Sequence, residues 1–136
     1  MSTSAQHEKV LRRFVADFIN GGDEAVLSDL IHEDYLYRSP GEELRGRASL
    51  AAMFEGLRAA FPDMELSIHR VISTDDTTVM DFSLTGTHRG DFMGIPATDR
   101  SIDIRGVVIS RYRDGKIAEE WEILDTLTML QQLDVA

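Results

Sequence analysis

The sequence of 136 residues contains no cysteine and only three prolines. The absence of cysteine excludes disulfide bonds, thiolate catalysis and cysteine-ligated metal sites. No apolar stretch approaches the roughly 18 residues that a membrane-spanning helix requires, and the first ten residues lack the apolar segment of a signal peptide. We therefore expect a cytoplasmic protein with no membrane partner.

Positive charge is also scarce, because 14 lysines and arginines stand against 24 aspartates and glutamates and give a net charge of −10. A chain this acidic repels phosphate groups, which argues against nucleic acid and anionic lipid as partners. The four histidines do not show HxH or HExxH spacing, so the sequence predicts no metal site. It also lacks a glycine-rich phosphate loop and a nucleophile elbow, and we expect no cofactor.

The apolar residues predict one domain over residues 1–136, because this length suffices for one hydrophobic core but not for two. A first helix carries an apolar stripe from Leu11 to Ile19, and a short second helix follows Asp23, which we expect to be its N-cap. Residues 35–39 are β-prone, and a polar turn over 41–47 leads to a third helix. That helix carries the apolar residues from 50 to 61 and ends at Pro62.

After Pro62 the pattern changes from helical to β. It predicts four strands joined by short connections and one loop rich in glycine and proline, over 64–74, 77–87, 100–113 and 116–124, with the loop at 88–99 and a bulge near Arg70. The order predicts an α+β fold, in which a curved, mainly antiparallel sheet wraps three helices of the N-terminal half and forms a cone with an apolar pocket.

One face of that sheet is left without a covering helix. Ile104 and Val108 belong to the apolar line of strand 100–113, whereas Val107 and Ile109 on the opposite line place apolar surface on the uncovered face. We therefore expect a homodimer that forms through the sheet.

The candidate catalytic residue lies at the end of the last strand, in the stretch "EEWEILD". Period-two alternation places Ile117, Glu119, Trp121, Ile123 and Asp125 on one face. In an apolar pocket, desolvation would raise the pKa of Asp125 and suit it to acid/base catalysis. Alternatively, Asp125 is the N-cap of a short C-terminal helix that begins with "DTLTML". The pattern alone leaves both interpretations open.

Other residues are candidates for substrate contacts. Arg105 either holds a substrate oxygen or forms a solvent-exposed ion pair with a neighbour such as Asp103. His88 lies between a strand and the loop that follows it, where the rims of pockets are usually found, and it is either a substrate contact or a structural residue. Tyr37 is either a hydrogen-bond donor to a substrate or a half-buried core residue. The apolar residues of the third helix and the loop suit a pocket lining and a plain core equally well.

Three stretches resemble the SnoaL-like polyketide cyclases, a branch of the nuclear transport factor two (cystatin-like cone) superfamily. They are "AAFPDMELSI", "GTHRGDFMGIPATDRSIDIRG" and "SRYRDGKIAEEWEILDTLTMLQQL", and the resemblance covers nearly the whole chain. It implies a role in antibiotic biosynthesis, namely the cofactor-independent, intramolecular aldol closure of a hydrophobic, polyketide-like small molecule. By its position in WxxxD, Asp125 would be the single acid/base. The candidate substrate contacts are Trp121, Arg105, His88, Tyr37, Arg38, Phe54, Leu57 and Phe92.

The chain departs from the family pattern at two places. Many relatives have His or Asn just before the proline of the first strand, where this chain has Arg38 and Ser39. The family's cyclases also carry a histidine on the penultimate strand that supports the aspartate, and residues 100–113 contain only arginines in its place. An arginine would lower the pKa of a neighbouring aspartate. The departures leave room for a cofactor-free hydroxylase, an isomerase, an epoxide hydrolase, or a non-catalytic module that binds small molecules.

Overall fold

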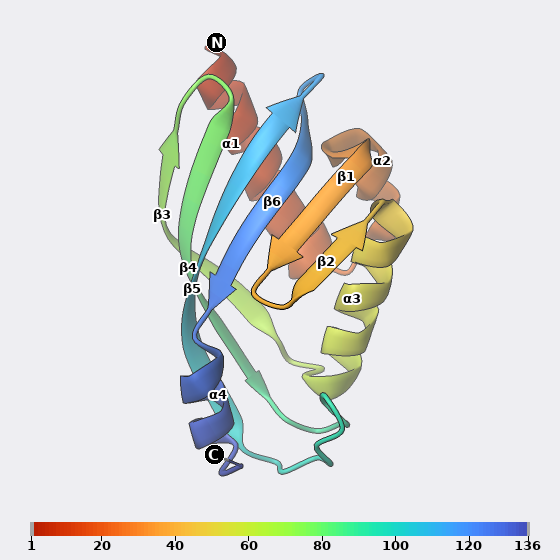
Figure 1. Ribbon diagram of the computed structural model, residues 1–136, viewed down its shortest axis with the longest axis vertical. Coiled ribbons are helices and arrows are strands. Elements are labelled where there is room, and N and C mark those ends of the chain that lie inside the picture. Colours follow the sequence, from red (N-terminus) through yellow and green to blue (C-terminus); the bar gives the residue numbers. More distant parts are fainter. Residues whose placement is uncertain (1, 136) are drawn as a thin grey trace.

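The computed structural model describes residues 2–135, which form helices packed on one curved sheet (Figure 1). The elements in chain order are α1 (Thr3–Arg13), the π-helical η1 (Phe14–Ile19), the 3₁₀-helical η2 (Glu24–Val26), α2 (Leu27–Leu30), β1 (Ile31–Ser39), β2 (Glu42–Arg45), α3 (Arg47–Ala60), β3 (Glu65–Ser73), β4 (Thr77–Thr87), β5 (Ser101–Arg113), β6 (Lys116–Leu124) and α4 (Thr126–Gln132). None of the helices described is long and apolar enough to cross a membrane.

The helical half follows the local signals in the sequence. Leu11, Phe14 and Phe18 are almost completely buried and form the apolar stripe of α1 and η1 that faces the sheet. The carboxylate of Asp23 accepts a hydrogen bond from the Ala25 N–H, so its predicted role as an N-cap is confirmed. The first helix therefore crosses the inner face of the sheet, and α3 stands beside β1 and β2 (Figure 1).

The sheet contains six strands in the order β2-β1-β6-β5-β4-β3. All neighbouring strands are antiparallel except β1 and β6, which are parallel. The predicted α+β fold with a mainly antiparallel, curved sheet is confirmed. The parallel pair is important for the site, because it places the first strand of the chain beside the last one.

Strands β4 and β5 alternate regularly between a buried inner side and a more exposed outer side. Their inner residues, Met80, Phe82, Leu84, Ile102, Ile104 and Val108, belong to the core. Gly106 also faces inward, and a Cβ atom there would lie 2.5 Å from Cζ of Phe82. The apolar line predicted for residues 100–113 is therefore confirmed as the inner one, and glycine is needed where the Phe82 ring crosses β5.

Three local predictions differ from the structure. The first strand begins at Ile31 rather than at residue 35, because β1 spans Ile31–Ser39. The stretch 41–47 is not simply a turn, because Glu42–Arg45 forms the edge strand β2, antiparallel to β1. Its four residues contain one apolar side chain, Leu44, so no alternation marks them as a strand. The bulge in β3 interrupts the pairing with β4 between Ile68 and Arg70, slightly earlier than predicted.

Candidate active site

Two tyrosine–glutamate pairs link β1 to β6 on the inner face of the sheet. The hydroxyl of Tyr35 donates to Oε1 of Glu120 over 2.6 Å, and the hydroxyl of Tyr37 donates to Oε1 of Glu122 over 2.7 Å. β1 and β6 are parallel, and Tyr37 is the Cα partner of Glu120. Moving two residues forward on both strands therefore leads from the Tyr35–Glu120 pair to the Tyr37–Glu122 pair. The fold therefore brings two carboxyl groups side by side in the interior.

The Tyr35–Glu120 pair is sealed in the core. Oε2 of Glu120 accepts a second hydrogen bond from Oγ of Ser110 over 3.0 Å, and all three residues are buried. Desolvation raises the pKa of the Glu120 carboxyl, although both hydrogen bonds oppose that effect, and it also raises the pKa of Tyr35. Because both carboxyl oxygens have protein partners, this pair suits a structural role.

The Tyr37–Glu122 pair is more open. Tyr37 is buried, whereas Glu122 is only partly buried, and within the described chain no hydrogen bond occupies its Oε2. Desolvation raises the pKa of Glu122 from 4.5 to about 7, the hydrogen bond from Tyr37 lowers it, and the negative charges of Glu120 and Glu42 raise it. A carboxyl group with such a pKa is present in both protonation states at neutral pH, as general acid/base catalysis requires.

The surroundings of Glu122 are apolar. On β5 it lies opposite Val108, and the next inward residue of β6, Leu124, lies opposite Gly106. Met53, Phe54 and Leu57 of α3 pack against the same core and remain partly exposed, as does Leu124. The predicted apolar residues Phe54 and Leu57 thus pack against the hydrophobic core.

Asp125 lies outside this interior. It is the N-cap of α4: its Oδ1 accepts from the Thr128 N–H over 3.1 Å, and its Oδ2 accepts from the Thr128 hydroxyl over 2.7 Å. These hydrogen bonds lower the pKa of the exposed Asp125 carboxyl. The predicted raised pKa is therefore wrong, and the alternative of a helix cap is confirmed. A catalytic role for Asp125 stays a prediction that the geometry does not favour.

Asp125 lies outside the interior because the predicted line of residues on the last strand points away from the core. Trp121 and Ile123 share a face, as predicted, but it is the outer one, and Trp121 is 42% exposed. Ile117, which was predicted on the same face, is fully buried, and Asp125 follows the end of the strand. Two further candidate residues, Arg38 and Arg105, are also exposed on the outer side, and Nη2 of Arg105 donates to Oδ1 of Asp81 over 2.6 Å. The structure therefore places four candidates away from the tyrosine–glutamate pairs of the inner face, namely Asp125, Trp121, Arg38 and Arg105.

His88 and Phe92 lie with the loop that follows β4. His88 is fully buried, and its Nδ1 accepts from the Thr98 N–H over 3.3 Å and lies 3.0 Å from the Thr98 hydroxyl. Both rings lie against Phe61, each with a centroid distance of 5.4 Å. His88 therefore anchors the loop to the end of α3.

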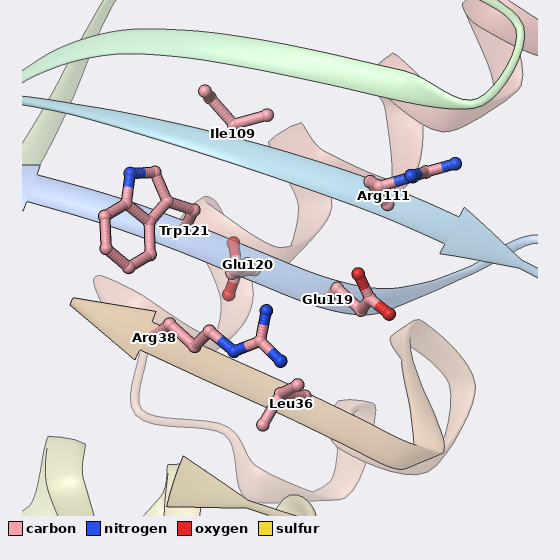
Figure 2. Close-up of a pocket in the computed structure, with 7 residues that line it drawn as sticks. All are labelled: Leu36, Arg38, Ile109, Arg111, Glu119, Glu120 and Trp121. Carbon is pink, nitrogen blue, oxygen red and sulfur yellow. The ribbon is translucent and has the colours of Figure 1, made fainter. Parts of the chain in front are cut away.

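The outer face of the sheet carries a shallow hollow of about 160 Å³ (Figure 2). Its lining residues are Leu36, Arg38, Ile109, Arg111, Glu119, Glu120 and Trp121. Neither Tyr37 nor Glu122 is among these lining residues, so the hollow is separate from the more open of the two tyrosine–glutamate pairs. Among residues 2–135 no group of three histidine or acidic side chains is placed to hold a metal ion.

The two inward glutamates were missed by sequence reasoning because of a bulge in β6. Tyr112 pairs with Ile117, and Arg111 pairs with Glu119, so the ladder skips Ala118 and the alternation changes phase there. Ile117 is therefore buried although Glu119 and Trp121 point outward. The available signal was the pair of acidic residues in "EEWE" that alternate with tryptophan.

Comparisons with known proteins agree on one family. A family model described as SnoaL-like polyketide cyclase matches residues 9–133. The aklanonic acid methyl ester cyclases DnrD of Streptomyces peucetius and DauD of Streptomyces sp. (strain C5) are 30% and 29% identical to this chain. Each alignment covers 91% of it, and 88% and 79% of the respective relative. The crystal structure of IdmH from Streptomyces antibioticus is 32% identical, with a TM-score of 0.84 over 96% of this chain and 99% of that one.

Proposed function

We propose that this chain, which belongs to the SnoaL-like polyketide cyclase family, closes a ring in a polyketide-like substrate by an intramolecular aldol reaction, with Glu122 as the acid/base. The observation that carries the proposal is the side chain of Glu122, a residue that is only partly buried, with a carboxyl that is hydrogen-bonded to Tyr37 and has a pKa of about 7. Two cyclases named for aklanonic acid methyl ester are about 30% identical to it, which supports a substrate of that chemical kind.

The ionised Glu122 carboxylate takes a proton from a carbon that lies between two carbonyl groups of the substrate. The resulting enolate carbon attacks a second carbonyl carbon, so that a carbon–carbon bond forms and the carbonyl π electrons move to its oxygen. Protonated Glu122 then returns the proton to that alkoxide. The carboxyl ends each cycle in the state in which it began, and the reaction consumes no oxidant or other reagent.

Tyr37 positions the carboxyl in this mechanism. Its hydroxyl holds Oε1 of Glu122 and leaves Oε2 free for the substrate proton. Desolvation raises the pKa of Tyr37 as well, so the phenol stays protonated and remains a donor throughout. The apolar side chains of α3 supply the remaining requirement, a largely dry surface that orients a hydrophobic substrate.

The test compares two substitutions, Glu122→Gln on β6 and Asp125→Asn just after it, with aklanonic acid methyl ester as the first trial substrate. Loss of a general acid/base costs about 10²–10⁴-fold in rate. We expect a loss of that size in kcat for Glu122→Gln, whereas Asp125→Asn should retain most of the wild-type rate. Unchanged circular dichroism spectra would control for folding. Substantial activity in Glu122→Gln together with its loss in Asp125→Asn would refute the assignment and support the helix-capping aspartate instead.

A further inference from the structure

The inner face of β6 carries two carboxyl groups, and neither has a positively charged partner. Glu120 and Glu122 occupy successive inward positions on this strand, with the outward Trp121 between them. Residues two apart on a strand are separated by about 7 Å. Among residues 2–135 no ion pair includes either glutamate. Two negative charges this close and away from water repel each other, so one carboxyl must hold its proton to a higher pH than the other.

Hydrogen bonds decide which of the two carboxyls ionises first. The Glu120 carboxyl accepts from two hydroxyl groups, that of Tyr35 over 2.6 Å and that of Ser110 over 3.0 Å. Within the described chain the Glu122 carboxyl accepts only from Tyr37, over 2.7 Å. Hydrogen bonds to a carboxylate stabilise its ionised form, and two stabilise it more than one. Glu120 is therefore the fixed anion of the pair, and Glu122 is the member that keeps its proton towards neutral pH.

The pKa shifts of the neighbouring groups agree with this order. Desolvation raises the pKa of both carboxyls, and at Glu120 the hydrogen bonds from Tyr35 and Ser110 oppose it. At Glu122 the negative charge of Glu120 adds to desolvation, and the pKa reaches about 7. The same charge also raises the pKa of Tyr112 on β5. Two groups around Glu120 thus respond to its ionised carboxylate.

The surroundings of Glu120 towards α1 are rich in hydroxyl groups. The hydroxyl of Tyr112 lies 2.8 Å from that of Thr78, and both residues come from strands beside or next to β6. The ring of His7 stacks on the Tyr112 ring with a centroid distance of 4.1 Å, and Glu8 of the same helix is a second acidic group that raises the pKa of Tyr112. This side therefore supplies dipoles and a further negative charge, but no ion pair to Glu120.

On the other side, Glu42 of β2 is the further charge that raises the pKa of Glu122. Its side chain is exposed, whereas Glu120 is buried. Water and salt screen an exposed charge much more strongly than a buried one. Glu120 is therefore the carboxylate whose charge acts on Glu122 with the least screening.

We propose that Glu120 is a positioning residue of ring closure, because its buried carboxylate keeps the transferable proton on Glu122 at neutral pH. The inference rests on the proposed role of Glu122 as the acid/base. Glu120 does not meet the substrate, since hydroxyl groups of the protein occupy both of its oxygens. It acts through Glu122 and sets the pH range in which that carboxyl can both take a proton from carbon and return it.

The experiment compares Glu120→Gln with Glu120→Asp. Glutamine can keep a hydrogen bond to each hydroxyl without a charge, whereas aspartate keeps the charge on a shorter side chain. Each variant is followed by an NMR titration of the Glu122 carboxyl carbon and by a pH–rate profile of kcat with aklanonic acid methyl ester. In Glu120→Gln both midpoints should fall from about 7 by at least about one pH unit, because the repulsion is removed while desolvation remains. In Glu120→Asp both should stay near 7.

Glu42→Gln is the matched control, because it removes an exposed negative charge that also raises the pKa of Glu122. It should move the midpoint of Glu122 much less than Glu120→Gln does. An unmoved midpoint in Glu120→Gln would overturn the proposal. An equal fall in Glu120→Asp or in Glu42→Gln would also overturn it, because the effect would then not come from the buried charge.

The wild type supplies a readout that needs no substitution. The Glu120 carboxyl signal, assigned through the backbone, should be that of an ionised group at pH values where Glu122 still holds its proton. A Glu120 signal that ionises after that of Glu122 would overturn the proposal. A Glu122 midpoint that falls in Glu120→Gln while the pH–rate profile stays in place would refute Glu122 as the acid/base. That result would end the role of Glu120 in ring closure but not its hold on the Glu122 proton.

Discussion

Replacing Glu122 with glutamine should change how the stability of the protein depends on pH. The carboxyl has a pKa of about 7 in the folded chain and about 4.5 as its ordinary value. Below pH 4.5 it is protonated in both the folded and the unfolded chain. Between the two pKa values the folded chain holds one more proton, so the stability that the neutral carboxyl provides is lost as the pH rises and is gone above about pH 7.

The size of the effect follows from the two pKa values. In the window between them the free energy of unfolding should fall by about 1.4 kcal/mol per pH unit relative to the glutamine variant, which keeps a neutral group at every pH. Between pH 5.5 and 7 this amounts to about 2 kcal/mol, and above pH 7 the difference should stay constant.

Urea unfolding followed by circular dichroism, at several values between about pH 5.5 and 8, measures this difference for wild type and Glu122→Gln. Asp125→Asn is the matched control. Hydrogen bonds lower the pKa of Asp125 below 3.8. The stability that its ionised carboxylate provides is therefore fully present throughout this pH range and is lost only at more acidic pH. A wild-type curve parallel to that of Glu122→Gln would refute the raised pKa and with it the electrostatic argument for the site.

Three further predictions concern catalysis and folding. The rate of ring closure should rise with pH through about 7 as Glu122 ionises. Tyr37→Phe should move this rise to higher pH, because the hydrogen bond from Tyr37 lowers the pKa of the Glu122 carboxyl. A pH–rate profile of kcat measures both effects. Asp125→Ala should lower the melting temperature by removing the N-cap of α4, and an unchanged melting temperature would contradict the capping role. Gly106→Ala should destabilise the protein by about 1–3 kcal/mol in chemical unfolding, because the added methyl group meets the ring of Phe82; a neutral result would show that the core yields there.

Much of the fold is encoded in local patterns that a single sequence shows. The strands over 77–87 and 116–124 have the predicted bounds, and the helix stop before Pro62 and the cap at Asp23 follow from single residues. These features depend on backbone chemistry within a few residues. The parallel pairing of β1 with β6 joins segments about 85 positions apart, and no local pattern indicates it.

The candidate site was harder to predict for the same reason. Alternation correctly grouped Trp121 with Ile123, but it does not say which face of a strand points inward. That direction depends on the bulge at Ala118, which shifts the phase between Ile117 and Glu119. In the sequence alone, two glutamates beside a tryptophan are typical of a solvent-exposed strand. Only the tertiary structure places the two tyrosines of β1 against them. The acidic pair is therefore a property of the tertiary structure.

An NMR titration of the Glu122 carboxyl carbon in glutamate-labelled protein, with the signal assigned by its absence in Glu122→Gln, decides whether this carboxyl can serve as the acid/base. We expect a midpoint at about pH 7, because desolvation on the inner face outweighs the hydrogen bond from Tyr37. A midpoint near the ordinary value of 4.5 would show a solvated carboxylate and would contradict its role as the acid/base.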